Sequence, residues 1–123
     1  MESEKDNKKY YEILGIAQTA NREEIAASYR QAALLAHPLR NDKSVEAVSL
    51  KKFSALCQAY EILSDPLMKR IYDKYGEYSL MNGIIKGTDK FSGYIYAGNP
   101  YKIFENFFGS DNPFVEEPQP IDG

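Results

Sequence analysis

Histidine and cysteine are almost absent from this 123-residue chain, which contains only His37 and Cys57. A single cysteine excludes an internal disulfide and is typical of a reducing compartment. A zinc site needs several cysteine or histidine ligands, and these two residues are too few to supply them. A catalytic arrangement of the two would need a fold that brings them together. We therefore expect no cofactor, no metal and no enzymatic activity.

Other absences narrow the function further. No apolar run approaches the ~18 residues of a membrane span, and the charged first nine residues lack the apolar region of a secretory signal. A net charge of −3 argues against a large nucleic-acid footprint. No glycine-rich phosphate loop with a following lysine is present. The sequence thus favours protein partners, with no nucleic acid and no membrane among them.

The residues that are present predict an all-α fold whose helix ends are marked by caps and breakers. Residues 10–14 form a short first helix that Gly15 ends. Asn21 with Glu24 three residues later resembles a capping box that opens a second helix, and Pro38 ends it. The expected buried stripe of this helix is Ile25, Tyr29, Ala32 and Ala36.

A third helix over residues 45–63 is expected to run antiparallel to the second. Its apolar stripe is Val45, Val48, Phe53, Leu56, Tyr60 and Leu63. The polar loop 39–44 joins the two helices into a hairpin. This order of elements puts His37, Pro38 and Leu39 at the exposed tip of the hairpin, away from the core.

Two later helices are predicted from a polar cap followed by proline. The first covers residues 67–75, after Asp65-Pro66, and ends at Gly76. The second is a short amphipathic helix over residues 99–109 with the stripe Ile103, Phe104, Phe107 and Phe108.

The remaining segments read as irregular. Residues 77–98 hold four glycines and several tyrosines without a helical period, which predicts a loosely ordered linker with a short extended piece at 93–96. Residues 1–9 are expected to be a polar leader and residues 110–123 an acidic tail that contains proline. An ending of this kind also fits a fragment of a longer protein.

Residues 10–76 resemble a J-domain of the DnaJ family in the order and spacing of their motifs. The matching residues are 10–16, Glu24-Ile25, Tyr29-Arg30, His37-Pro38, 59–66, Arg70 to Asp73 and Gly76. Residues 93–114 are similar to class B members, above all to the axonemal J-proteins of ciliary and flagellar radial spokes, which also have leucine after His-Pro. The resemblance implies further β-rich domains and a dimerising end, which this sequence does not contain.

In that family, a His-Pro-Asp tip and a basic face on the second helix bind a DnaK-type chaperone and stimulate its ATPase. Here Leu39 replaces the aspartate. The five positions of the second-helix face are Ala26, Ala27, Arg30, Gln31 and Leu35. Residues 21–36 carry no net charge, so steering toward an acidic partner is weak. Truncating one side of an interfacial charge pair can lose ~2–5 kcal/mol, and the resemblance therefore implies a DnaK-type contact that is weak or lost.

In related class B proteins, the helix after the linker is thought to dock over the partner-binding face. Phe104, Phe107 and Phe108 match that helix. A helix this short is marginal alone, whereas burying each phenylalanine contributes ~1.5–3 kcal/mol. We expect the three rings to fold back on the second and third helices, and the apolar residues of the second-helix face to make that docking more permanent. A partner protein is the alternative surface for them.

Two functions follow from the resemblance. The first is a scaffold subunit of the radial spoke in a cilium or flagellum, with other spoke subunits as partners and a homodimer formed through a C-terminal region. The second is a working co-chaperone that stimulates a DnaK-type ATPase. A generic helical adaptor without J-domain ancestry is a third reading. Leu39 could also be tolerated loop variation, the neutral helix could bind a divergent chaperone, and His37 could simply pack at the hairpin turn.

Overall fold

The computed structural model describes residues 6–37 and 46–109. Residues 1–5 of the expected leader 1–9, the loop 39–44 and the tail 110–123 lie outside these ranges. The same holds for Pro38 and Leu39 of the expected tip, and for the side chains of Val45 and Val48. Within the described ranges the chain forms six helices and one two-stranded sheet. The expected helical fold is confirmed, with a small sheet that the sequence did not predict.

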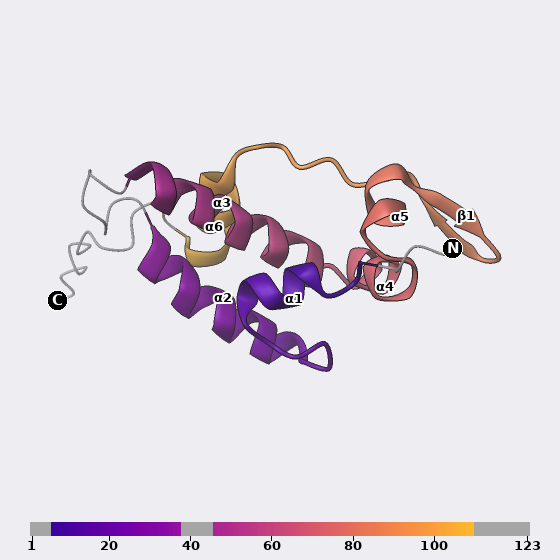
Figure 1. Cartoon of the computed structure of the whole chain (residues 1–123), viewed down its shortest axis with the longest axis horizontal. Coiled ribbons are helices and arrows are strands. Elements are labelled where there is room, and N and C mark those ends of the chain that lie inside the picture. The colour runs from indigo at the N-terminus through magenta and orange to yellow at the C-terminus, as the bar shows by residue number, and fades with distance from the viewer. Residues whose placement is uncertain (1–5, 38–45, 110–123) are drawn as a thin grey trace, which may run out of the picture.

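Helices α2 (Arg22–Ala36) and α3 (Glu46–Leu63) form the predicted antiparallel hairpin, and α1 (Lys9–Leu14) lies against both (Figure 1). The predicted caps are confirmed. Gly15 ends α1 with a φ of 70°, and the Asn21 side chain and the Glu24 backbone form the capping box that opens α2. The core sits where the three helices meet.

The buried stripes differ in detail from the prediction. On α2, Ala33 is fully buried, whereas the predicted Ala32 is half-buried and packs against the core. On α3 the stripe also includes Cys57, Ala59 and Ile62, because α3 contacts helices on several sides. A helix that is packed on several sides buries a wider band than a single 3.6-residue stripe.

Helix α4 (Pro66–Tyr75) begins as predicted, with the Asp65 carboxylate accepting from the backbone of Leu67 and Met68. The prediction of a loosely ordered linker after α4 was wrong. Residues 77–98 contain a helix, α5 (Glu77–Asn82), and an antiparallel hairpin of β1 (Ile84–Lys86) and β2 (Asp89–Phe91). These elements are too short to show a period in the sequence. No strand forms at 93–96.

Residues 92–99, here called the strap, leave the β-hairpin and run along α3 (Figure 1). They lead into α6 (Pro100–Phe108), which the Asn99 side chain caps and Gly109 ends. Helix α6 packs on α3, at the end of α3 that lies far from α4 and α5. The strap therefore carries the chain back from the α4–α5 end to the end of the helical hairpin where α2 ends and α3 begins.

Candidate partner-binding face

His37 lies in the core and not at an exposed tip. Its side chain is 1% exposed, and its ring lies 5.1 Å from the ring of Phe53 and 4.7 Å from that of Phe104, centroid to centroid. The expectation of a surface position was wrong because it treated the helical hairpin alone. Helix α6, which is distant in sequence, supplies the ring that covers this end of α2. The alternative that His37 packs at the turn describes what is found.

The three phenylalanines of α6 lie on the helical hairpin. The ring of Phe107 meets Tyr29 of α2 edge-on at 5.1 Å and Tyr60 of α3 at 5.2 Å, and these two tyrosines stack on each other at 4.3 Å. Phe104 is fully buried, and Phe108 lies 4.3 Å from it. Aromatic pairs at these separations contribute about 0.5–1.5 kcal/mol each beyond their burial. Helix α6 is thus attached to both helices of the hairpin by an aromatic cluster.

Four of the five positions of the predicted second-helix face are exposed. Ala27, Arg30, Gln31 and Leu35 are exposed, Leu35 by 62%, while Ala26 is half-buried. The residues that α6 contacts, such as Tyr29, point to another side of α2. The expectation that the apolar residues of this face strengthen the docking of α6 stays a prediction. Arg30 is the one cation among the five positions.

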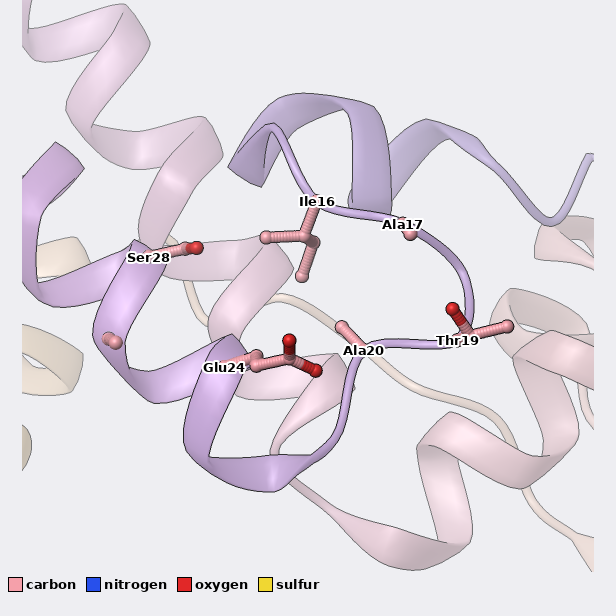
Figure 2. A pocket seen from close by; sticks show the side chains of 7 residues that line it. Ile16, Ala17, Thr19, Ala20, Glu24 and Ser28 are labelled. Atoms are coloured by element: carbon pink, nitrogen blue, oxygen red, sulfur yellow. The ribbon is translucent and has the colours of Figure 1, made fainter.

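A hollow of about 350 Å³ adjoins this face, between α2 and the turn that precedes it (Figure 2). Its walls are formed by Ile16, Ala17, Thr19, Ala20, Glu24, Ala27 and Ser28. The one carboxylate among them accepts the backbone hydrogen bond of Asn21 at 2.8 Å and so belongs to the helix cap. The other polar side chains of the lining are the hydroxyls of Thr19 and Ser28.

Cys57 is a free cysteine that is buried in the core. Burial raises the pKa of Cys57 to about 12, although a hydrogen bond with the Tyr29 hydroxyl, at 3.3 Å, acts in the opposite direction. Among the described residues, no three histidine, cysteine, aspartate or glutamate side chains gather as a metal site would require. None of the described helices combines the length and the apolar character needed to cross a membrane.

Sequence reasoning missed an ion cluster around Asp89 of the β-hairpin, in which the carboxylate is buried and the two cations are exposed. The Asp89 carboxylate accepts hydrogen bonds from the Tyr75 hydroxyl at 2.6 Å, from Arg70 at 3.0 Å and from Lys74 at 3.2 Å. The hydrogen bond from Tyr75 and the two cations hold the pKa of Asp89 below its usual range. The cluster attaches the β-hairpin to α4. No local pattern marks Asp89, because its partners lie 14 to 19 residues away.

The tyrosines of the strap were also missed as binding residues. The Tyr94 hydroxyl donates a hydrogen bond to the Glu61 carboxylate of α3, and the Tyr96 hydroxyl shares one with the Ser54 hydroxyl at 2.7 Å. Tyr94 is 8% exposed. Alternating tyrosines in a segment without helical period were the available signal, but their partners are not visible in the sequence.

Comparison with known proteins finds a matching family and several similar relatives. The DnaJ domain family matches residues 9–73. The chain is 42% identical over 111 residues to human DnaJ homolog subfamily B member 13, a match that covers 87% of this chain and 34% of that protein. It is 43% identical over 111 residues to mouse DnaJ homolog subfamily B member 5, covering 87% and 30%. It is 44% identical over 104 residues to rice chaperone protein dnaJ A6, covering 85% and 22%. The chain spans about a third or less of the length of these relatives.

Proposed function

Because the chain belongs to the DnaJ (J-domain) family, we propose that it is a J-domain protein that acts as a scaffold and stimulates a DnaK-type ATPase little or not at all. Members of this family are co-chaperones that partner with DnaK-type chaperones, and they are generally not enzymes themselves. The proposal concerns how far this chain departs from that activity.

The observation that carries the proposal is the chemical character of the exposed face of α2. Arg30 is its one cation, and Ala27 and Leu35 stand exposed beside it. An acidic partner is then steered only weakly, because steering depends on the summed charge of the face that it approaches. Leu39 replaces the tip carboxylate that the family uses, so the two departures affect the same contact.

The docking of α6 also supports the proposal, because α6 covers a different part of the hairpin surface. The rings of Phe104 and Phe107 occupy the surface formed by His37, Tyr29 and Tyr60. A partner that needs the His37 end of α2 would first have to displace α6. Displacement would expose the ring of Phe104, whose burial stabilises the docked state by ~1.5–3 kcal/mol.

By resemblance, the scaffold is the radial spoke of the axoneme, in a cilium or flagellum. Its partners there are other spoke subunits, and the full-length protein pairs as a homodimer through further C-terminal sequence. The support for this location is leucine after His37-Pro38, which the axonemal class B proteins share. Immunolocalisation of the tagged protein in ciliated cells tests it: signal confined to the cell body would contradict an axonemal role.

Single-turnover ATP hydrolysis by a DnaK-type chaperone tests the scaffold function. We expect the unmodified chain to accelerate hydrolysis less than twofold, while a J-domain with an intact His-Pro-Asp tip serves as the positive control. The second candidate, a working co-chaperone, is favoured by the retained His37-Pro38 and Arg30. Stimulation by the unmodified chain comparable to that of the control would favour this second function and reject the first.

A further inference from the structure

Helix α6 needs more than its own residues to stay in place. It has nine residues, and helices of this length are marginal in isolation. Eight strap residues, 92–99, connect it to the β-hairpin. A freely moving linker of that size would present α6 at an effective concentration in the millimolar range. A strap that is fixed on the domain presents α6 at a higher effective concentration, because less conformational entropy is lost when α6 docks.

The strap is fixed to α3 at two points. Tyr94 donates to Glu61, and Tyr96 shares a hydrogen bond with Ser54 at 2.7 Å. Glu61 and Ser54 are seven residues apart, which is about two turns of α3. The strap therefore follows the axis of α3 toward the end where α6 docks (Figure 1).

The start of the strap is fixed independently of α3. The backbone N–H of Tyr94 donates to the carbonyl of Leu80 in α5 at 2.8 Å. Gly93 approaches α5 so closely that a Cβ there would lie 2.8 Å from the carbonyl oxygen of Met81. The Asp89 ion cluster holds the preceding β-hairpin to α4. The side-chain hydrogen bonds of Tyr94 and Tyr96 therefore lie between the fixed start of the strap and helix α6.

The chemistry of the Tyr94 bond suits a stable attachment. Burial, together with the neighbouring Glu61 carboxylate, raises the pKa of Tyr94 above its usual value. The phenol therefore keeps its proton and remains a donor at neutral pH. A hydrogen bond to an ionised acceptor is about twice as strong as one between neutral groups.

We propose that Tyr94 and Tyr96 form a latch on α3 that sets how often α6 lifts from the aromatic cluster. They are positioning residues, since neither touches the rings of α6 in the pairs described above. When the latch opens, α6 detaches and exposes Phe53, Tyr60 and His37 to a partner. The consequence for partner access rests on the proposed function, but the latch itself does not.

Amide hydrogen exchange of the full chain tests the latch. The variants are Tyr94→Phe, Tyr96→Phe and the double variant, and each removes only a hydroxyl. Tyr78→Phe is the matched control, because Tyr78 is 79% exposed. In the double variant we expect the α6 amides to exchange about tenfold faster, which corresponds to about 1.4 kcal/mol. The buried amides of α2 and α3 should change less than twofold, and the control should match the unmodified chain.

Two outcomes would overturn the latch. Unchanged exchange of the α6 amides in the double variant would mean that the aromatic cluster alone holds the helix. An equal increase in α2, α3 and α6 would mean that the two hydroxyls contribute to global stability and not to α6 in particular. Neither outcome depends on ATP hydrolysis, so the latch and the scaffold function can fail separately.

Discussion

The ring of His37 lies 4.7 Å from the ring of Phe104, and both side chains are at most 1% exposed. This contact joins the last residues of α2 to a helix that begins more than sixty residues later. Because of this contact, His37 is a core residue and not the exposed tip residue that the sequence predicts. The state of α6 therefore decides whether His37 can meet a partner at all.

Replacing Phe104 with alanine should release α6 and expose His37. Phenylalanine-to-alanine changes in a core cost about 3–5 kcal/mol, but here the loss cannot exceed the free energy of docking α6, because the helix can detach. Diethylpyrocarbonate modification of the single histidine reports the exposure without interference from a second one. We expect the imidazole to react at least about tenfold faster in Phe104→Ala, and Ile95→Ala, at an exposed site, to behave as the unmodified chain. Equal imidazole reactivity in all three proteins would contradict the burial.

Replacing Asp89 with asparagine should loosen the β-hairpin in a pH-dependent way. The pKa of Asp89 is depressed by Tyr75, Lys74 and Arg70, so its stabilisation is fully present above the unfolded value of about 3.9 and is lost as pH falls through the lower folded value. Urea unfolding at neutral pH should show Asp89→Asn less stable than the unmodified chain. The difference should shrink as the pH falls below about 4. A difference that is constant with pH would mean that the carboxylate charge is not involved.

Replacing Gly93 with alanine should destabilise the start of the strap. Gly93 has a φ of 111° and Gly98 a φ of 77°, so alanine is unfavourable at both positions by about 1–2 kcal/mol. Only at Gly93 would the new Cβ also meet a backbone oxygen, whereas at Gly98 nothing lies within 4 Å. We expect Gly93→Ala to lower the free energy of unfolding by at least about 1 kcal/mol more than Gly98→Ala. Equal losses would show that the close approach to Met81 can relax.

The Cys57 thiol should be inert in the folded protein. Its side chain is fully buried and its pKa is raised to about 12 by burial. Thiolate is the reactive form, so at about pH 8 the native thiol should react with a disulfide reagent at least about a thousandfold more slowly than the urea-unfolded chain. Comparable rates in the two states would contradict the placement of Cys57 between α2 and α3.

Local signals in the sequence predicted much of this fold, and long-range contacts account for the rest. The Asn21 and Asp65 caps, the ending at Gly15 and the stripe of α6 are set by residues within a few positions of one another. The burial of His37 depends on α6, and the hairpin of residues 84–91 depends on an ion cluster with α4. Those partners lie far along the chain and follow no period, so pattern reasoning did not find them.

The most direct test of the account restores the missing groups one at a time and measures single-turnover ATP hydrolysis by a DnaK-type chaperone. The variants are Leu39→Asp, Phe104→Ala to release α6, and Ala27→Lys with Gln31→Lys to restore a basic face on α2. We predict that no single change restores stimulation fully and that the combined variant exceeds each of them by at least about tenfold, since the losses act on one contact. Strong stimulation by the unmodified chain, or no stimulation by the combined variant with its fold intact, would contradict the account.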